Sequence, residues 1–207
     1  MASFGRIAVV FAVCISFSAA EQIRAIVALH GSVVNGSVTF TQDPYGGPVT
    51  ITGVVMGLSP GNHGMHVHEK GDLSGGCGSS GGHFNPGMTN HGGPSSAIRH
   101  VGDLGNINAN SKGVATVAAV DSVVSLQNIS PHCILGRTLV IHAGEDDYGL
   151  GGYSDSLTTG HAGARVACGI IGIMSPPTSS VSSIAISHCG SGLLLILIPA
   201  FLRFLLK

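Results

Sequence analysis

Hydrophobic and polar residues alternate with a period of two along much of the chain. The first such run, Ile23 to Leu29, is apolar at every second position, which is typical of a half-buried β-strand. The run from Val49 to Val55 is rich in β-branched residues, which favours a strand as well. Together the runs predict eight strands. The remaining ones are residues 37–42, a strand carrying His66 and His68, and residues 101–109, 113–120, 135–142 and 165–173.

Two long segments, residues 71–100 and 143–163, show no periodicity and are dominated by Gly and other turn-forming residues. Loops of this length in a compact domain are usually functional or disordered, and metal ligation and a disulfide would order the first. With 32 Gly and only 9% charged residues, the composition favours a turn-rich β protein. We therefore predict an all-β domain, an eight-stranded Greek-key flattened barrel or sandwich with two long functional loops.

The N-terminal end, residues 1–20, has a positive start, an apolar run and small residues before Glu21. This order of features predicts a secretory signal peptide cleaved after Ala20. The folded domain is then expected to occupy residues 21–174.

The C-terminal end begins with a Pro/Ser linker, residues 175–192, followed by an apolar tail, residues 193–207. The apolar part would span roughly 21 Å as a helix, short of the ~30 Å hydrocarbon core of a bilayer. Small residues, a spacer and an apolar end describe a GPI-attachment signal, with Ser180 and Ser183 as attachment positions. A transmembrane helix starting near Ile184 and an interior helix of a soluble domain are the alternatives. A lipid anchor or a C-terminal span would each place the domain at the cell surface, outside the cell.

Three of the five cysteines, Cys77, Cys133 and Cys168, lie between the predicted signal peptide and the tail. Export permits a disulfide, and the odd count leaves one thiol over. Asn35 and Asn128 begin sequences that fit the N-glycosylation pattern. Residues 21–183 hold six Lys and Arg against ten Asp and Glu, a net charge of −4. This acidic balance, without a basic run, argues against nucleic-acid binding.

Histidine supplies the candidate chemistry. His66 and His68 are two residues apart on a predicted strand, so both imidazoles point to one face and form half of a metal site. A second group of candidate ligands follows at irregular spacing. These are His83, His91, His100, Asp103 and His142. We expect the other histidines to be surface or hydrogen-bonded core residues. These are His30, His63, His132, His161 and His188.

Several stretches resemble the copper/zinc superoxide dismutase family, and the resemblance covers about residues 22 to 174. It implies the β-sandwich architecture of that family. The matching stretches are residues 64–86, 91–94, 99–106, 136–142 and 163–169.

The resemblance implies two metals with a shared ligand. Copper would be held by His66, His68, His83 and His142. Zinc would be held by His83, His91, His100 and Asp103. These sets agree with general chemistry, because copper prefers tetragonal imidazoles and zinc accepts a tetrahedron that includes a carboxylate.

The same resemblance implies roles for residues around the metals. Asp146 would accept hydrogen bonds from one ligand of each metal and set their tautomers. Cys77 and Cys168 would form the disulfide and leave Cys133 free. The family also commonly forms homodimers through apolar strand and loop surface, although residues 127–132 look longer than usual here.

The activity implied is superoxide dismutation. Cu(II) oxidises one superoxide to O2, and Cu(I) reduces a second to hydrogen peroxide, whereas zinc has no redox chemistry. The shared ligand His83 would supply a proton when copper is reduced. Arg165 would hold the anion by charge-assisted hydrogen bonds, and Thr159 matches a threonine of the substrate channel.

The second loop departs from the family pattern, which carries a lysine and acidic residues that steer superoxide. Thr158 stands where the lysine is expected, and Ser154 replaces one acid. His161 is a candidate for a pH-dependent contribution. We expect the association rate to fall less steeply with ionic strength than in lysine-bearing relatives.

Two other functions are alternatives on this sequence. A catalytically silent copper/zinc-binding or adhesion module on the same fold would be expected to lose a copper ligand or Arg165, and none is lost. A copper-delivery protein would be expected to carry a thiol-rich motif such as Cys-x-x-Cys, which the sequence lacks.

Overall fold

The computed structural model describes residues 21–174. The predicted signal peptide, linker and apolar tail, with Ser180, Ser183 and His188, lie outside the described residues. Within residues 21–174, no helix has the length and apolar character needed to cross a membrane.

The described chain is almost entirely β-structure. A 3-10 helix, η1 (Gly76–Ser80), and a four-residue helix, α1 (Ser156–Thr159), lie in the two long loops. The strands are β1 (Ile23–His30), β2 (Asn35–Asp43), β3 (Gly46–Met56), β4 (Gly61–His68), β5 (Asp103–Ala109), β6 (Val114–Asp121), β7 (Thr138–His142), β8 (Arg165–Ile170) and β9 (Gly172–Ile173).

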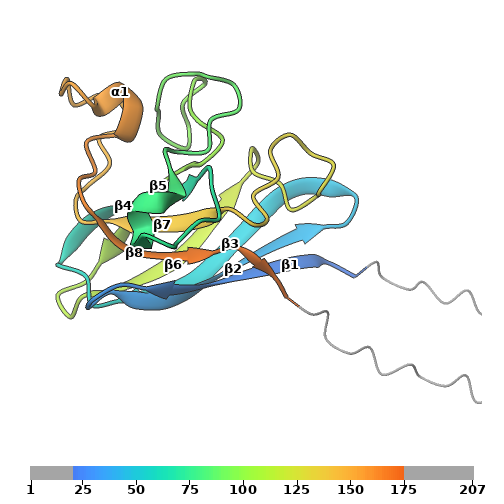
Figure 1. The fold of residues 1–207 in the computed structure, drawn as a ribbon, viewed down its shortest axis with the longest axis horizontal. Coiled ribbons are helices and arrows are strands. Elements are labelled where there is room, and N and C mark those ends of the chain that lie inside the picture. The colour runs from blue at the N-terminus through green and yellow to red at the C-terminus, as the bar shows by residue number, and fades with distance from the viewer. Residues whose placement is uncertain (1–20, 175–207) are drawn as a thin grey trace, which may run out of the picture. The chain divides into compact units, whose positions relative to one another are not determined.

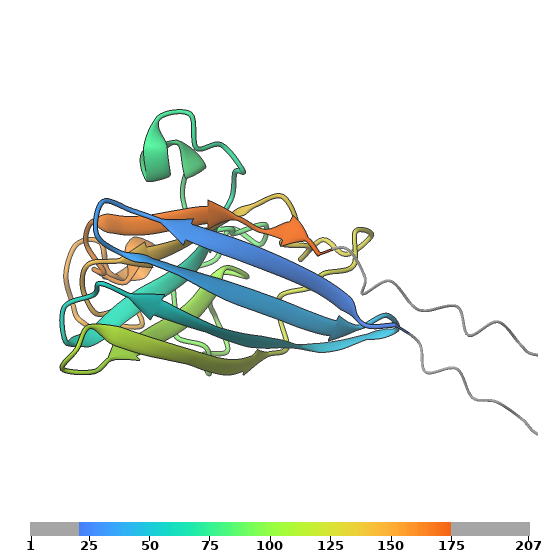
Figure 2. The same cartoon turned by 90° about the horizontal axis from the view of Figure 1, so that it is seen from below.

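The strands form one antiparallel sheet that closes on itself. Its order is β2-β3-β6-β5-β4-β7-β8-β1-β9, and pairing of β2 with β1 completes the barrel. Figure 2 shows β1, β2, β3 and β6 side by side across one face. Because β3 pairs with β6 and β4 with β7, two connections cross the barrel ends, which is the Greek-key arrangement. The predicted all-β barrel is confirmed.

The core follows the alternation seen in the sequence. Apolar residues at every second position of β1, β2 and β3 are buried, because successive side chains of a strand point to opposite faces. Phe40, Leu29 and Ile51 are among the largest fully buried side chains.

Three strands are shorter than predicted or are interrupted. β5 begins at Asp103 because residues 100–103 form a turn, in which the Asp103 amide donates to the His100 carbonyl (3.3 Å). β7 begins at Thr138, because Gly136 has φ 75° and the Arg137 amide turns back to the Ile134 carbonyl (3.2 Å). The final strand is interrupted at Ile171, whose amide donates to the Arg137 carbonyl (2.8 Å).

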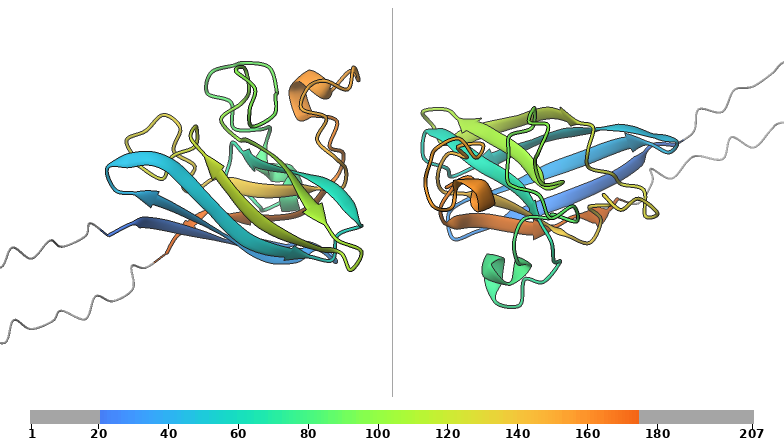
Figure 3. Two further views of the ribbon diagram at one scale, coloured as in Figure 1. Left: turned by 180° about the vertical axis from the view of Figure 1, so that it is seen from behind. Right: turned by 90° about the horizontal axis from the view of Figure 1, so that it is seen from above.

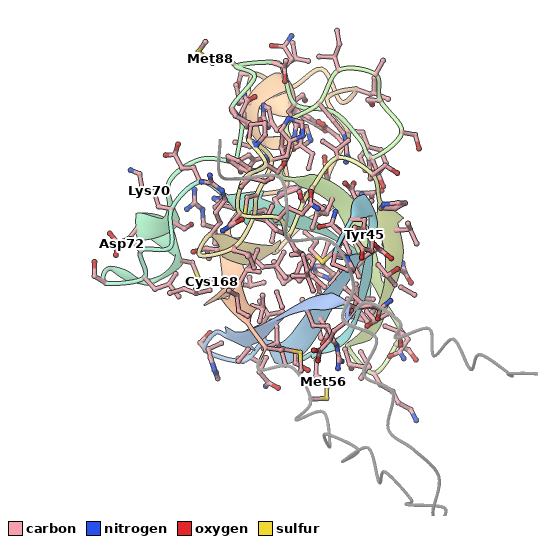
Figure 4. The ribbon with its side chains drawn as sticks, turned by 90° about the vertical axis from the view of Figure 1, so that its right-hand side faces the viewer. Tyr45, Met56, Lys70, Asp72, Met88 and Cys168 are labelled. Atoms are coloured by element: carbon pink, nitrogen blue, oxygen red, sulfur yellow. A yellow bond between two sulfur atoms is a disulfide. The ribbon has the colours of Figure 1, made fainter. Side chains whose placement is uncertain are left out.

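Two long loops, residues 69–102 and 143–164, connect β4 to β5 and β7 to β8. In Figure 1 and Figure 3 both rise from the same side of the barrel. The part of the first loop that carries η1 projects from the barrel, with Lys70 and Asp72 on it, whereas Met88 lies at the outer end of the other part (Figure 4). A disulfide between Cys77 and Cys168 of β8 ties the projecting part to the barrel. The loops cover a strand face that would otherwise meet solvent.

Candidate metal centre

Strand β4 places two imidazoles outside the barrel and under the loops. Met65 and Val67 belong to the hydrophobic core, so His66 and His68 point to the opposite face. Both are still buried, at 0% and 1% exposure, because the two loops cover that face. The Cα of His66 pairs with that of Asp103 on β5, which brings a ligand of the first predicted metal beside a ligand of the second.

The structure gathers the predicted copper ligands into one buried cluster. One ligand atom from each of four residues lies within 4.8 Å of the other three. The Nε2 atoms of His68 and His142 are 3.4 Å apart. The four residues are His66, His68, His83 and His142.

The predicted zinc ligands form a second buried cluster with the same compactness. The Nδ1 atom of His83 is 2.9 Å from Oδ1 of Asp103, and Nδ1 of His100 is 3.1 Å from the same oxygen. The cluster consists of His83, His91, His100 and Asp103, so His83 belongs to both sets.

Each of five ligand rings has one nitrogen committed to a protein partner. His68 Nδ1 donates to the Gly81 carbonyl (2.9 Å), His142 Nδ1 to the Gly163 carbonyl (3.0 Å) and His100 Nε2 to the Thr89 carbonyl (3.1 Å). Nε2 of His66 and Nε2 of His91 each donate a hydrogen bond to the Asp146 carboxylate. These contacts set the tautomer and leave the other nitrogen of each ring for a metal.

Asp146 joins the two clusters. Its Oδ2 accepts a hydrogen bond from Nε2 of His66 (2.9 Å), and its Oδ1 accepts one from Nε2 of His91 (2.7 Å). The carboxylate is fully buried with both rings. It therefore contacts one member of each predicted ligand set, in the arrangement that the family resemblance implies.

The donor atoms fit two metal ions. Two buried nitrogens, His66 Nδ1 and His83 Nε2, have no hydrogen-bond partner, and a third, His91 Nδ1, faces only the Asp103 carboxylate at 3.0 Å. Leaving buried polar atoms unpaired is costly, and all three belong to the clusters. Donors about 2.1 Å from a tetrahedral centre lie about 3.4 Å apart, which matches the 3.4 Å between the Nδ1 atoms of His83 and His100. Imidazoles with one carboxylate suit zinc, and imidazoles alone suit copper.

The electrostatics favour neutral imidazoles on the copper side. Burial lowers the pKa of His66 to about 3 and that of His142 to about 4, and it also lowers the pKa values of His68 and His83. These rings are therefore unprotonated at neutral pH, as metal ligands must be.

In the predicted zinc cluster, hydrogen bonds and charge interactions favour an ionised Asp103 and a protonated His91. Burial opposes ionisation of Asp103, but hydrogen bonds from His100, His83 and His91 outweigh it and hold the carboxyl pKa well below its usual range. Burial likewise opposes protonation of His91, yet hydrogen bonds to Asp103 and Asp146 raise its pKa to about 9. A dication would replace the proton that His91 holds at neutral pH.

Arg165 is anchored beside the disulfide. Its Nη1 donates to the Cys77 carbonyl (2.8 Å) and to Ser80 Oγ (3.1 Å), and its Nη2 donates to the Gly81 carbonyl (2.7 Å). The Gly81 carbonyl also accepts from His68. One backbone group thus connects the guanidinium to a predicted copper ligand.

Other predicted residues take less central places. Thr159 ends α1, and its hydroxyl contacts Asp155, as does that of Thr158. His63 is buried, with ring nitrogens facing the carbonyls of Ser59 (2.8 Å) and His142 (2.9 Å). It is a hydrogen-bonded core residue, as predicted from the sequence. The remaining predicted residues stand as follows: His30 is exposed, His132 contacts the Val123 carbonyl, and Cys133 is a half-buried free thiol.

Two supporting contacts were not anticipated. Asn106 of β5 exchanges two hydrogen bonds with the backbone of Asp146, both 2.8 Å. Arg99 forms a buried ion pair with Asp121 (2.6 Å) and also donates to the Asp103 carbonyl. Asn is disfavoured inside a strand. The presence of Asn106 in β5 was therefore the one sequence feature that could have indicated its contact with Asp146.

Comparisons with known proteins agree with this geometry. A family profile described as copper/zinc superoxide dismutase (SODC) matches residues 34–171. Superoxide dismutase (Cu-Zn) 4 of Dictyostelium discoideum is 55% identical over 150 residues, covering 72% of this chain and 97% of the relative. The extracellular superoxide dismutase (Cu-Zn) of Drosophila melanogaster is 47% identical over 173 residues, covering 78% and 94%. The crystal structure of the clock protein EA4 matches with a TM-score of 0.70 and 47% identity, covering 78% of this chain and all of that chain.

The closed antiparallel barrel and the paired clusters define a two-metal β-barrel protein. The chain belongs to the copper/zinc superoxide dismutase family. It is an enzyme that dismutes superoxide, with copper and zinc as cofactors.

Proposed function

We propose that this enzyme dismutes superoxide at the cell exterior, and that His83 would belong to the ligand sets of both its copper and its zinc. The observation that carries the assignment is the pair of buried four-residue clusters that share this imidazole. His66, His68 and His142 complete the copper set, and His91, His100 and Asp103 complete the zinc set.

The protein's part in the reaction is positioning, charge and proton handling. When bound, copper supplies one-electron redox cycling, which oxidises one superoxide and reduces a second. His83 Nδ1 faces Asp103 at 2.9 Å, while its buried Nε2 has no protein partner. This nitrogen is therefore one atom at which the chain can take up and release a proton within the site, and it belongs to the ring that both clusters share.

Arg165 supplies the anion contact. A guanidinium has five N–H donors, and the contacts to Cys77, Ser80 and Gly81 fix its plane without using all of them. The remaining donors can form charge-assisted hydrogen bonds to superoxide. Thr159, at the end of α1 in the second loop, matches a threonine that lines the substrate channel in the family, and we assign it the same place here.

The role of Arg165 is tested with Arg165→Gln, with Lys112→Gln as a control that removes a charge from the exposed turn between β5 and β6. Hydrogen bonds to charged groups contribute about 1.5–3 kcal/mol, so we expect kcat/KM to fall by about 10-fold or more in Arg165→Gln only. Copper and zinc contents, measured in parallel, should be equal in all three proteins. An unchanged kcat/KM in Arg165→Gln would contradict the assignment.

The cellular location rests on the ends of the chain and on the disulfide. Residues 1–20 fit a signal peptide, residues 21–174 a folded domain, residues 175–192 a linker with a GPI-attachment region, and residues 193–207 its apolar signal. An exported location is compatible with the Cys77–Cys168 disulfide, because disulfides persist in oxidising compartments. The similarity to a relative named extracellular points the same way.

Two surface properties accompany this location. The sequon residues Asn35 and Asn128 are both exposed, so a glycan could be attached at either side chain. A homodimer is the assembly implied by the family, and Ile170 and Ile173, 45% and 71% exposed, offer apolar surface for it.

The anchor is tested on cells that express the full chain. Treatment with a phospholipase that cleaves GPI anchors should release the enzyme into the medium. A Ser180→Pro, Ser183→Pro double variant, which alters both candidate attachment residues, should no longer be displayed and released in this way. Enzyme that stays on the cells after phospholipase treatment would favour a membrane span instead.

A further inference from the structure

Arg137 immediately precedes β7 and contacts three different segments of the chain. Its Nη1 donates to the Glu69 carbonyl (2.6 Å), and its Nε donates to the Cys133 carbonyl (2.9 Å). Its Cζ lies over the Phe84 ring, 3.5 Å from the ring centre, which is a cation–π contact. Arg137 itself belongs to neither metal cluster.

Two of these segments pair with each other and carry metal ligands. Residues 67–70 and 80–84 flank the part of the first long loop that holds η1. Three backbone hydrogen bonds join them, at 2.8, 2.9 and 3.0 Å. His68 and His83 lie opposite each other in this antiparallel pairing. The pairing therefore sets the place of a predicted copper ligand relative to the ligand that both clusters share.

Arg137 contacts both members of this pair at the residue that follows the ligand. Glu69 comes directly after His68, and Phe84 comes directly after His83. The guanidinium donates to the backbone of the first and covers the ring of the second. It thus holds the two segments together beside both ligands.

Phe84 transmits this contact to the backbone of the shared ligand. Its side chain is buried in the core, at 5% exposure. Its amide donates to the Val67 carbonyl (2.8 Å), and its carbonyl accepts from the Gly102 amide (3.0 Å). A surface cavity of about 230 Å³ borders both Phe84 and Arg137. Loss of the guanidinium would therefore open one face of the ring to solvent and loosen the residue next to His83.

The backbone that carries Arg137 is itself held firmly. The Arg137 amide donates to the Ile134 carbonyl (3.2 Å), and its carbonyl accepts from the Ile171 amide (2.8 Å). The adjacent Thr138 donates its hydroxyl to the Lys70 carbonyl (2.7 Å). The guanidinium is therefore presented to the ligand-bearing segments from a rigid part of the barrel.

We propose that Arg137 is a positioning residue for the imidazole shared by the two metals. Acting through the Phe84 ring and the Glu69 carbonyl, it keeps His83 in the place from which its ring belongs to both clusters. A guanidinium suits this place because it donates in its plane to carbonyls while its face stacks on a ring, which an ammonium cannot do. The inference rests on the proposed copper and zinc sites.

The first test reports on the shared imidazole directly. The intact chain is loaded with Cu(II) in the copper site and Co(II) in place of zinc, and both metals are quantified per chain. Two paramagnetic ions that share an imidazolate are exchange-coupled, so the wild type should show little Cu(II) EPR signal. Arg137→Lys keeps the charge but loses the planar fork. It should show the signal of uncoupled copper at the same metal content.

The second test measures metal affinity by chelator competition. Loss of groups that orient ligands typically weakens metal binding by about 10–100-fold. Because Arg137 acts through another side chain, we expect the lower end, about 10-fold for copper in Arg137→Lys. Val38→Ala, which removes buried methyl groups from β2, is the control. It should lower Tm but leave the EPR spectrum and the affinity unchanged.

A double variant shows whether the effect passes through the ring. Phe84→Leu keeps an apolar side chain in the core but removes the aromatic face. It should also yield uncoupled copper, and adding Arg137→Lys to it should have a smaller effect than in the wild type. Effects of the two substitutions that simply add would contradict action through Phe84.

The remaining outcomes separate this inference from the proposed function. A coupled spectrum and wild-type copper affinity in Arg137→Lys, whatever its Tm, would overturn the positioning role and leave the proposed function standing. Uncoupled copper in Val38→Ala would also overturn it, because any loss of stability would then suffice. Uncoupled copper in the fully loaded wild type would contradict a shared His83 and so overturn both.

Discussion

Asp146 shows how one side chain can serve two metal sites. Its two oxygens accept from His66 and His91, one ring from each cluster, and Asn106 fixes its backbone through two hydrogen bonds. Neither imidazole ring could keep its orientation, with Nδ1 facing its metal site, if the carboxylate moved. We therefore propose that Asp146 is a positioning residue for copper and zinc together.

Asp146→Asn should weaken the binding of both metals. An amide can accept with only one of its two polar atoms, so one imidazole loses its acceptor and its preferred tautomer. Loss of such partners typically costs about 10–100-fold in metal affinity or activity. Chelator competition for copper and zinc measures the effect, with Asp43→Asn at the exposed β2–β3 turn as control. Wild-type affinity for both metals in Asp146→Asn would contradict the positioning role.

The sequence predicted which residues belong to the candidate site better than it predicted the contacts that they make. The candidate ligand residues and Asp146 were predicted from matching motifs, because such motifs preserve residue types. The sequence did not predict which ring nitrogen of each histidine faces the metal site. That choice depends on carbonyls that are distant in the sequence, such as those of Gly81 and Gly163. The ion pair of Arg99 with Asp121 and its hydrogen bond to the Asp103 carbonyl were not predicted either, because they also depend on the tertiary structure.

At the scale of elements, strands were predictable and loop paths were not. The period of two identified the strands because each has one face in the core. The two long loops have no such face, and their paths are set by long-range contacts. The Cys77–Cys168 disulfide, the Arg165 contacts and the pairing of the His91 amide with the Leu157 carbonyl (2.9 Å) are examples. Helix α1 is also too short to leave a periodic signal.

The turn after α1 gives a sharp test of loop packing. Gly160 and Gly152 both have positive φ, 64° and 75°, but a Cβ would collide with Asp146 and His91 only at Gly160, since Gly152 has open space. Gly152→Ala should cost only the left-handed backbone penalty, about 1–2 kcal/mol. Gly160→Ala should lower Tm further and also weaken zinc binding. Calorimetry and zinc titration of both variants measure this, and equal effects would argue against direct packing of Gly160 on the site.

At the scale of the whole molecule, acid should destabilise the metal-free protein. The pKa values of His66 and His142 are lowered to about 3 and about 4 from 6.5, so below pH 6.5 the unfolded chain binds protons that the folded chain does not. The depressed pKa values of Asp103 and Asp146 act in the same direction at lower pH. Stability is therefore lost as the pH falls from about 6.5.

The opposite sign applies to His91, whose pKa is raised to about 9. Its contribution to stability is complete below about pH 6.5 and is lost as the pH rises toward 9. The metal-free protein should thus have its highest Tm near neutral pH, with the steeper fall on the acid side, and metal loading should flatten the profile near neutrality. Scanning calorimetry of both forms tests this. A metal-free Tm that is constant from pH 7 to pH 5 would contradict the expected proton linkage.

Salt dependence is a second property of the whole molecule. Residues 21–174 carry six Lys and Arg against ten Asp and Glu, and Thr158 stands where the family carries a lysine. Long-range steering of the anion should therefore be weak. We expect log kcat/KM to fall less steeply with ionic strength, at constant pH, than in a lysine-bearing relative. Thr158→Lys should steepen the slope, and an equal or steeper slope in the wild type would contradict the expectation.

The two clusters around His83 are proposed to bind copper and zinc and to form the site that dismutes superoxide. The most direct measurement is the dismutation rate of the purified enzyme as copper is restored to zinc-loaded protein, with both metals quantified per chain. We predict that the rate rises in proportion to copper and saturates at one copper and one zinc per chain. Full loading with both metals and no dismutation would contradict the account.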